Sequence, residues 1–442
     1  MVTPVLMIVI PLLAAFLMPL IKKAHRYFTF SILLLNAILS VLLFAKVYND
    51  GAIYETIAGF SPPVGIYLAV DNLSALLALI INLFATINFV TSKKDFKFSM
   101  LYLLAVTGAT GIVLTGDIFN MFVFFEITAV ASYALVASKK DEKAVEGSIK
   151  YMILGSVGSS FMLIGIAIIY SQLKSLNLYD IAARISSMDP KMMWLSFSFL
   201  ITGIGVEAEL FPLNGWVPDA YEGASSNIAS FLSFGPSKAS IYAIARLLII
   251  FSMSRTYELA LYVGIATLLI GEVAAFMQKN EKRMLAYSSI GQMGLILIAF
   301  SLIKDTSYAI PAAFFIIVSH ASAKSSLFLI SGKKGFGGIT SKYVGLAGVL
   351  SLIGMPPMAG FWGKWYLLMG IADEKMWAVA AVIIFSAVIE AIYFARYLHK
   401  NLGEGESEDL GYSIPAAVMV SVSIVMGILP LIYNMAGGVL NA

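Results

Sequence analysis

The chain contains no cysteine, which excludes disulfide bonds, thiolate metal sites, iron–sulfur ligation and cysteine nucleophiles within it. Its three histidines are too few and too scattered for a metal centre. Phosphate-binding glycine loops and nucleophile motifs are also missing from the sequence, which argues against ATP hydrolysis. We therefore expect no cofactor, no metal and no catalytic redox chemistry in this chain itself, so that any electron transfer takes place elsewhere.

Charged residues are also scarce, at 12% of the 442 residues, whereas hydrophobic residues make up 60% and the mean hydropathy is +0.88. These values lie far outside the range of soluble globular proteins. The formal net charge of +3 is too small to favour nucleic acid as a partner. The composition predicts an all-α polytopic membrane protein in a lipid bilayer. At about 20 apolar residues per crossing, we expect fourteen helices, beginning near residues 2, 27, 69, 98, 117, 148, 193, 226, 257, 284, 308, 344, 376 and 412.

The distribution of positive charge predicts the orientation of these helices. Every second connection carries a basic cluster: Lys22, Lys23 and Arg26; Lys93, Lys94 and Lys97; Lys139, Lys140 and Lys143; Lys279, Lys282 and Arg283; Lys333, Lys334 and Lys342; Arg396 and Lys400. By the positive-inside rule, both termini then face the outer side of the cell membrane. Because no connection is long enough for a soluble domain, residues 1–442 are expected to form one transmembrane domain.

Helix-breaking residues interrupt two of the expected spans. Pro212 and Gly215 follow Glu207 in the seventh span, and Pro356 and Pro357 precede Lys364 in the twelfth. Backbone freed by proline at membrane depth persists only where it is buried in protein or lines a polar cavity. Interrupted helices five spans apart suggest an inverted repeat, as in secondary carriers, covering about residues 98–251 and 257–398.

Ionisable residues lie within the apolar segments. Glu126 is in the middle of IFNMFVFFEITAVASYALVA, where a lone carboxylate costs roughly 2.5–3.5 kcal/mol on the insertion scale. The other ionisable residues in or beside long hydrophobic segments are Glu207, Glu209, Lys238, Glu272, His320, Lys324, Lys364 and Glu390. A chain that repeats so costly an arrangement is expected to move ions through the membrane.

Several motifs resemble those of the Mrp-antiporter D and complex I antiporter-like subunit family. The stretch GIGVEAELFPLNGWVPDA is similar to the family's broken helix with its PLxxWxPDA signature, which leads into a helix with a buried lysine. FVFFEI resembles the family's fifth-helix glutamate motif and KRMLAYSSIGQMG its tenth-helix motif. SHASAKSSLFL and GMPPMAGFWGKW resemble the eleventh-helix histidine motif and the twelfth-helix lysine motif. Together these motifs cover about residues 60–400 in the family's order.

This resemblance implies fourteen helices, two inverted five-helix repeats with broken helices seven and twelve, and a central hydrated axis. In the family, a helix-five glutamate pairs with a helix-seven lysine, and protons pass along further lysines and a histidine to helix twelve. Carried over to this sequence, the ion-pathway roles fall on Glu126, position 207, Lys238, His320, Lys324 and Lys364.

Position 207 departs from the family pattern, because it holds glutamate where the family usually has lysine. If Glu126 and Glu207 are close, they cannot easily both ionise in a low dielectric, so they would share a proton and titrate as a coupled pair. Alternatively, carboxylate oxygens suit a hard cation such as Na⁺. A third alternative is that Glu207 and Glu209 only cap or hydrate the broken helix.

The remaining candidates for the pathway also have structural alternatives. His320 and Lys324 are four residues apart on one helix face and form a plausible proton relay. The alternative for Lys238 is that its ammonium only satisfies the backbone carbonyl freed by Pro236. Lys364 is assigned to the pathway, although its aromatic neighbours also suit a lysine that snorkels to the interface. For Glu272 and Glu390 both helix–helix pairing and a place in the pathway stay open, and Glu390 is included in the pathway. Lys150, near the inner end of the sixth helix, could snorkel to the interface, but it is expected close enough to the fifth helix to modulate Glu126.

The leading hypothesis is an ion-translocating subunit, for H⁺ or Na⁺ or both, of a redox-driven or cation/proton antiporter complex. As a resemblance, the chain is most similar to copies in archaeal membrane-bound hydrogenase or sulfur-reductase complexes, which implies other membrane subunits and a redox module as partners and makes it the membrane subunit of an oxidoreductase complex. Two alternatives remain open: a self-sufficient Na⁺/H⁺ antiporter, and a bridging subunit that no longer pumps.

Overall fold

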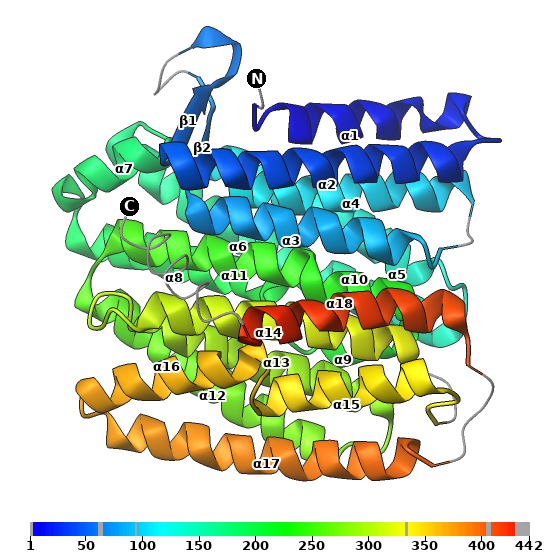
Figure 1. Ribbon diagram of the computed structural model, residues 1–442. Coiled ribbons are helices and arrows are strands. Elements are labelled where there is room, and N and C mark those ends of the chain that lie inside the picture. The colour runs from blue at the N-terminus through cyan, green and yellow to red at the C-terminus, as the bar shows by residue number, and fades with distance from the viewer. Residues whose placement is uncertain (1–2, 61–64, 93–94, 332–334, 404–407, 429–442) are drawn as a thin grey trace.

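The computed structural model describes residues 3–60, 65–92, 95–331, 335–403 and 408–428. Long helices run side by side through almost the whole molecule and form one bundle (Figure 1). A two-stranded hairpin projects at one end of this bundle, beside the short helix α7. The prediction of a helical membrane protein with many spans is therefore confirmed.

The first part of the chain, up to the residues around Glu207, forms α1 (Leu6–Leu17), η1 (Met18–Leu20), α2 (His25–Asp50), β1 (Ile53–Thr56), η2 (Ile57–Gly59), β2 (Tyr67–Val70), α3 (Asn72–Phe89), α4 (Phe96–Leu114), α5 (Ile118–Ala137), α6 (Glu142–Leu173), α7 (Leu178–Arg184), η3 (Ile185–Ser187) and α8 (Pro190–Glu207). The second part forms α9 (Val217–Gly223), α10 (Ser226–Phe234), α11 (Pro236–Phe251), α12 (Ser254–Met277), α13 (Glu281–Ser301), α14 (Ala309–Ile330), α15 (Ile339–Ile353), α16 (Ala359–Asp373), α17 (Trp377–Asn401) and α18 (Leu410–Ile428).

Aspartate begins four consecutive helices. In α3, α4, α5 and α6 the residue before the helix is an aspartate whose carboxylate accepts a hydrogen bond from the backbone N–H three residues later: Asp71, Asp95, Asp117 and Asp141. Such a cap satisfies one of the free N–H groups of the first turn and is worth about 1 kcal/mol. The caps fix where these spans begin.

Within the described ranges, eleven helices are long and apolar enough to cross a membrane, by length and composition. The apolar helices Leu6–Leu20 and Ile339–Ile353 are shorter, and residues 190–223 are divided between α8 and α9. The difference from the fourteen expected spans arises where proline and glycine end a helix early, since both residues oppose helix continuation. The number fourteen stays a prediction.

The connection after α2 is not purely a loop, and on this point the expectation of an all-α chain is wrong. β1 and β2 pair antiparallel, with Ile53 opposite Val70 and Thr56 opposite Tyr67. All four residues of β2 are buried, whereas those of β1 alternate between partly buried and exposed. Strands of only four residues give a weak periodic signal, which explains why the sequence did not predict them.

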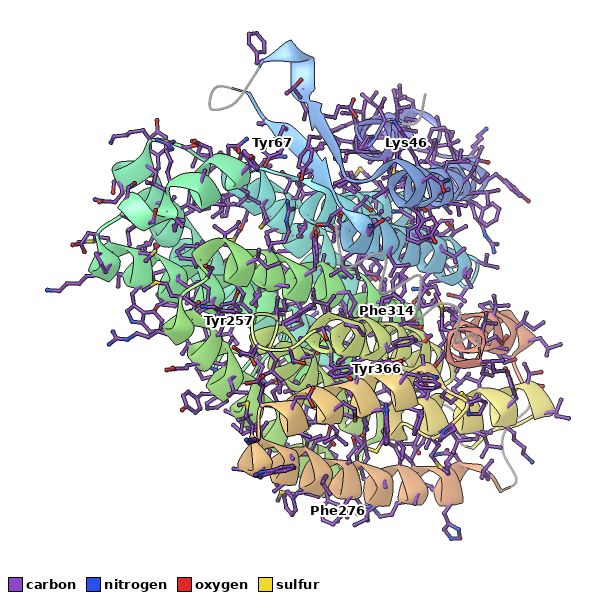
Figure 2. All side chains as sticks on the ribbon, turned by 60° about the vertical axis from the view of Figure 1, so that its left-hand side comes forward. Lys46, Tyr67, Tyr257, Phe276, Phe314 and Tyr366 are labelled. Atoms are coloured by element: carbon purple, nitrogen blue, oxygen red, sulfur yellow. The ribbon has the colours of Figure 1, made fainter. Side chains whose placement is uncertain are left out.

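Burial separates central from peripheral helices. In α13 and α14 almost the entire span is buried, at 94% of residues, whereas α2, α6 and α17 are each buried over only 33%. Large apolar side chains cover the exposed sides of the peripheral helices, as the stick view illustrates (Figure 2). A helix whose exposed face consists of apolar side chains is suited to contact with lipid. The polar and charged residues of the central helices are therefore shielded from the bilayer by the outer ring.

Candidate functional site

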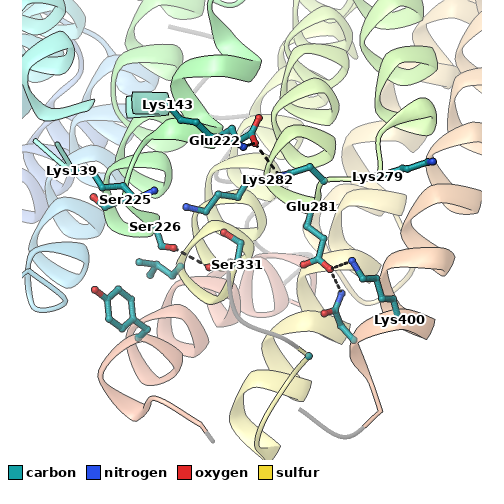
Figure 3. Close-up of a pocket in the computed structure, with 15 residues that line it drawn as sticks. Lys139, Lys143, Glu222, Ser225, Ser226, Lys279, Glu281, Lys282, Ser331 and Lys400 are labelled. Carbon is teal, nitrogen blue, oxygen red and sulfur yellow. Dashed lines mark hydrogen bonds and ion pairs between the residues drawn. The ribbon is translucent and has the colours of Figure 1, made fainter. Parts of the chain in front are cut away.

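A charged hollow of about 870 Å³ lies at the basic end of the bundle (Figure 3). Lysines outnumber glutamates in its lining: Lys139, Lys143, Lys279, Lys282 and Lys400 against Glu222 and Glu281. Ser331, which directly follows α14, also lines it. Because Lys324 precedes Ser331 by seven residues, the hollow opens about 10 Å, or two helical turns, from that buried lysine. The hollow thus reaches the end of α14, the helix that carries Lys324.

An ion-pair cluster beside the hollow joins three helices. Asp219 of α9 binds Lys150 of α6 at 2.7 Å and Arg283 of α13 at 2.5 Å. Arg283 also pairs with Glu222 at 3.0 Å, and Glu222 pairs with Lys143 at 2.6 Å. Asp219 and Glu222 lie outside the eleven spans. Burial would raise the pKa of Asp219, but hydrogen bonds from Lys150 and Arg283 outweigh it and hold this pKa below its usual value.

Lys150 forms its ion pairs away from Glu126, although the sequence predicted that it lies close enough to modulate this glutamate. The Lys150 ammonium binds Glu146 at 2.6 Å in addition to Asp219, so it faces the basic end. Glu126, on α5, is partly buried and accepts a hydrogen bond from the Ser159 hydroxyl of α6. Among the described residues, no cation forms an ion pair with Glu126.

Glu207 is the last residue of α8 and is buried. Its Oε2 accepts a hydrogen bond of 2.6 Å from the Tyr151 hydroxyl of α6, and its Oε1 has no hydrogen-bond partner in the described part of the chain. The Tyr151 ring stacks on Trp216, with centroids 3.6 Å apart, and the Trp216 indole donates to the carbonyl of Val206. The end of α8 is thus fixed by two aromatic rings.

The carboxylates of Glu126 and Glu207 hydrogen-bond to side chains of the same helix, α6, and the charge of Glu126 acts on Glu207. Their partners on that helix, Ser159 and Tyr151, are eight residues apart, which corresponds to about 12 Å along the axis. No hydrogen bond joins the two carboxylates in the described structure. Coupling between them is therefore electrostatic rather than through a direct hydrogen bond, and the shared proton stays a prediction.

Glu209 and Lys238 occupy the centre of the bundle. Glu209 lies in the turn after α8 with a positive φ of 62°, and its Oε1 accepts a hydrogen bond of 2.6 Å from the Tyr221 hydroxyl of α9. Lys238, on the first turn of α11, is completely buried and donates to Ser237 Oγ at 3.0 Å and to Met293 Sδ at 3.3 Å. No described carboxylate lies within 4 Å of its ammonium, so the charge of Lys238 has no direct counterion.

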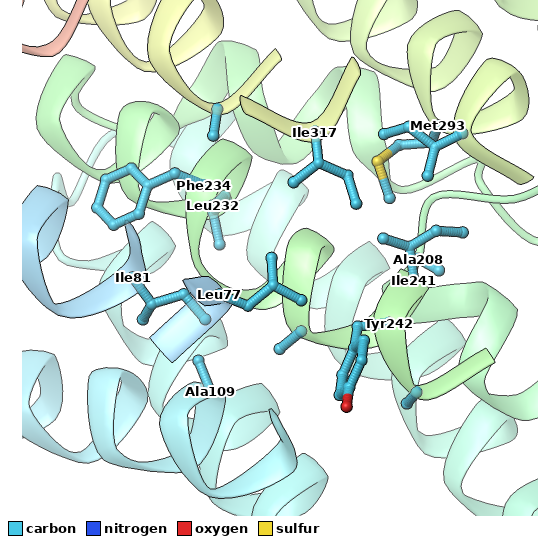
Figure 4. Close-up of a cluster of buried hydrophobic side chains, with 14 of the residues drawn as sticks. Leu77, Ile81, Ala109, Ala208, Leu232, Phe234, Ile241, Tyr242, Met293 and Ile317 are labelled. Atoms are coloured by element: carbon cyan, nitrogen blue, oxygen red, sulfur yellow. The ribbon is translucent and has the colours of Figure 1, made fainter. Parts of the chain in front are cut away.

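Apolar side chains pack around α11, the helix that carries this lysine. The cluster shown in Figure 4 joins α11 to α3, α4, α10, α13, α14 and the turn after α8, and it includes Leu77, Ile81, Ala109, Ala208, Leu232, Phe234, Ile241, Met293 and Ile317. Tyr242, one turn after Lys238 on α11, also lies in the cluster and hydrogen-bonds Asp71 at 2.9 Å. The part of α11 that follows Lys238 is thus packed among apolar side chains.

His320 and Lys324 lie one turn apart on α14, and both are completely buried. The His320 Nε2 is 3.1 Å from Ser289 Oγ of α13, and its Nδ1 has no hydrogen-bond partner in the described part of the chain. The Lys324 ammonium donates to the carbonyl of Leu285 at 3.0 Å and lies 5.3 Å from the centre of the Phe394 ring. Both side chains point from α14 into the interior, as expected for a relay.

Lys364 points inward rather than toward the membrane interface. Its ammonium binds the Glu390 carboxylate of α17 at 2.5 Å and the carbonyls of Leu352 and Ile353 at 2.8 and 3.1 Å. These carbonyls are free because α15 ends at Ile353, and the last carbonyls of a helix attract cations. The other oxygen of Glu390 accepts a hydrogen bond of 2.6 Å from Gln292. The break between α15 and α16 therefore creates half of the lysine's binding site.

Several partners of these residues were not singled out from the sequence: the tyrosines Tyr151, Tyr221 and Tyr393, together with Ser289 and Gln292. A buried tyrosine normally finds a partner for its hydroxyl, so tyrosine in an apolar segment near a carboxylate was an available signal. Within the described ranges, no group of three or more histidine or acidic side chains could hold a metal ion.

The comparisons agree with the motifs. Residues 115–390 match the protein family described as NADH:quinone oxidoreductase/Mrp antiporter, TM. NADH-quinone oxidoreductase subunit N of Desulforudis audaxviator is 32% identical, covering 91% of this chain and 87% of the relative. A Na(+)/H(+) antiporter subunit of Bacillus subtilis is 27% identical, covering 96% and 93%. A chain of the membrane-bound sulfane sulfur reductase, an archaeal respiratory membrane complex, superposes with a TM-score of 0.91 at 34% identity, covering 99% and 97%.

Proposed function

Because the chain belongs to the NADH:quinone oxidoreductase/Mrp antiporter transmembrane family, we propose that it translocates H⁺ or Na⁺ as one membrane subunit of a multisubunit complex. The observation that carries this proposal is the series of buried ionisable side chains through the centre of the bundle, from Glu207 to Glu390, whose partner Lys364 is partly buried. Buried charges are costly and mark ion routes in membrane proteins. Here they occupy the shielded central helices.

Unsatisfied polar atoms support a hydrated route. Glu207 Oε1, Glu209 Oε2 and His320 Nδ1 are buried and have no hydrogen-bond partner among the described residues. Buried polar groups of this kind are usually satisfied by ordered water. Water molecules beside these atoms would connect the side chains, and chains of water and titratable groups conduct protons. The lysine-lined hollow provides solvent access from the basic end.

We assign the pathway to the residues expected from the sequence: Glu126, Glu207, Glu209, Lys238, His320, Lys324, Lys364 and Glu390, with Lys150 at the basic end. The proposed frame is a single transmembrane domain of fourteen crossings, with inverted repeats at about 98–251 and 257–398. The breaks after Glu207 and after Ile353 support this frame. Both termini are assigned to the outer side, on the basis of the basic connections.

The proposed partners are other membrane subunits and a redox module. The sulfane sulfur reductase to which the chain is similar is a respiratory membrane complex, and this similarity extends over 99% of the chain. The chain brings no thiolate ligand for a redox centre, because it contains no cysteine. Energy for uphill transport would thus come from a partner subunit.

The test is ion movement in proteoliposomes that contain the purified native complex, with internal pH and Na⁺ followed by fluorescent dyes. The proposal expects ion movement coupled to the partner's reaction, and reduced movement in His320→Ala. The isolated chain in the same vesicles is expected to be inactive; antiport by the chain alone would favour a self-sufficient antiporter. Unchanged ion-to-electron stoichiometry in Glu126→Gln and His320→Ala complexes would instead favour a bridging subunit that does not pump.

A further inference from the structure

Glu272 is a buried carboxylate of α12 that the proposed pathway does not use. Only 1% of the residue is exposed. Its Oε2 accepts a hydrogen bond of 2.8 Å from the Tyr393 hydroxyl of α17, while its Oε1 has no hydrogen-bond partner in the described part of the chain. No described cation lies within 4 Å of this carboxylate, in contrast to Glu390, which is paired with Lys364.

A glycine makes the room for this carboxylate. A methyl group at Gly291 of α13 would collide with Oε1 of Glu272 and lie 2.9 Å from its Cδ. The two helices approach closely here, since a methyl group at Gly271 would lie 2.7 Å from the Cα of Gly291. The Glu272 carboxylate therefore occupies a gap that exists because residue 291 has no side chain, next to the contact between α12 and α13.

Tyr393 connects the Glu272 carboxylate to α17, the helix that carries Glu390 of the Lys364–Glu390 ion pair. Tyr393 follows Glu390 by three residues on α17, so the two side chains share a helix face. Its hydroxyl also lies 2.6 Å from Ser288 Oγ of α13. The charged groups that act on Glu272 are Glu390, Lys364 and Lys324. Glu272 thus lies within electrostatic range of a second carboxylate and of two lysines.

We propose that Glu272 is a proton-binding site that works as a pair with Glu390, an inference that rests on the proposed transport function and deepens it. Two carboxylates in a buried region oppose each other's ionisation, so a proton on one favours the charged form of the other. A proton arriving at Glu272 strengthens the Lys364–Glu390 ion pair. Loss of that proton favours protonation of Glu390, which releases the ammonium of Lys364. The proton moves between carboxylate oxygens, and no bond other than O–H is made or broken.

The test uses two substitutions that reach the carboxylate in different ways. Glu272→Gln removes the titratable group, and Gly291→Ala displaces it with a methyl group whose nearest obstacle is the mobile end of that side chain. In the reconstituted complex, each variant should lower ion transport about tenfold or more and shift its pH profile. Because both act on one group, the double variant should be no worse than Glu272→Gln.

Gly264→Ala is the matched control, because a methyl group there also meets α13, at 2.9 Å from Ile298, but meets no carboxylate. It should leave the pH profile unchanged. The proposal is overturned if Glu272→Gln transports with the wild-type rate and pH profile. It is also overturned if Gly291→Ala lowers transport equally in the Glu272→Gln background, because the effect would then come from helix packing.

An infrared titration separates this inference from the proposed function. A protonated buried carboxyl group gives a C=O stretching band that shifts in D₂O, and this band should be present in the native complex and in Gly264→Ala but lost in Glu272→Gln. If the native complex moves no ions, the proposed function fails, while the band still reports whether Glu272 binds a proton. Absence of a band assignable to Glu272 over the whole pH range overturns the inference.

Discussion

Glu207 and Glu209 stand two residues apart, yet their carboxylates accept hydrogen bonds from tyrosines of two different helices. Tyr151 of α6 donates to Glu207, and Tyr221 of α9 donates to Glu209, each at 2.6 Å. Each glutamate keeps a second buried oxygen without a hydrogen-bond partner in the described structure. The end of α8 thus directs one carboxylate toward α6 and the other toward the neighbourhood of Lys238, which makes it a natural transfer point in the proposed pathway.

Glu207→Gln tests whether this transfer point is active. If the carboxylate takes part in transport, the substitution should lower ion movement about tenfold and alter its pH profile, because the amide cannot bind the transported proton. Tyr151→Phe should give a weaker effect in the same direction, since it removes only the hydroxyl donor and keeps the ring on Trp216. Ion movement in vesicles at several pH values is the measurement.

Glu207→Lys restores the residue that the family usually carries at this position. It therefore distinguishes a glutamate that takes part in transport from a site that has lost its transport function. If transport increases in this variant while Glu207→Gln has no effect, the wild-type protein has lost the transport function of the glutamate–lysine pair. A silent Glu207→Gln with an unchanged pH profile would end the idea of a proton shared with Glu126.

Glu126→Gln should abolish or sharply reduce transport while the complex still assembles, because the amide preserves the shape of the side chain and removes its proton-binding group. Ser159→Ala is the matched change on the partner helix, since the Ser159 hydroxyl donates to this carboxylate. It should cost less than Glu126→Gln, because it leaves the titratable group in place. Normal pumping by purified Glu126→Gln complex contradicts the assigned role.

Lys364 and Glu390 should behave as a coupled pair in stability. Lys364→Met leaves the 2%-exposed Glu390 carboxylate without its counterion and should destabilise the protein by about 3–5 kcal/mol. The double variant Lys364→Met/Glu390→Gln should recover a large part of this loss. Thermal unfolding of the purified complexes measures both effects. Strictly additive losses would mean that the two groups do not interact.

Asp219→Asn should weaken the ion-pair cluster at the basic end. Because the pKa of Asp219 is held below its usual value, its contribution to stability is complete above the ordinary aspartate range and disappears as the pH falls through the lowered pKa. The substitution should cost about 1–2 kcal/mol at pH 7 and progressively less as the pH falls below the ordinary aspartate range.

Glu146→Gln is the control for this prediction, since Glu146 binds the same Lys150 but its side chain is 57% exposed. An exposed pair of this kind contributes about 0.3–0.5 kcal/mol. Melting temperatures at neutral and acid pH provide the comparison, and equal effects of the two variants would argue against a special role of Asp219.

The sequence predicted a membrane protein and most of its helices, because apolar segments of about 20 residues are typical of membrane-spanning helices. The boundaries were harder where proline and glycine act. The sequence indicated an interruption near Pro212, but α8 already ends at Glu207, and helical structure resumes at Val217. The hairpin was missed because its strands have only four residues.

The site was predictable as a set of residues but not as a set of contacts. Buried glutamate and lysine are visible in a sequence because hydrophobic surroundings make them conspicuous. Their partners are not, since Glu390 and Gln292 are 98 residues apart and meet only through the packing of α13 and α17. Lys150 illustrates the limit: proximity of helices suggested Glu126, whereas the side chain extends to Asp219.

The ion-pair cluster at the basic end has a consequence for how the molecule can move. It joins α6, from the first proposed repeat, to α13, from the second, through Asp219 and Glu222 of α9. Rocking of one repeat against the other, as in carriers with alternating access, would have to break these bonds together in every cycle. The cluster therefore favours a mechanism in which the backbone stays still, and in which side-chain rotations and rearranged water open and close the route.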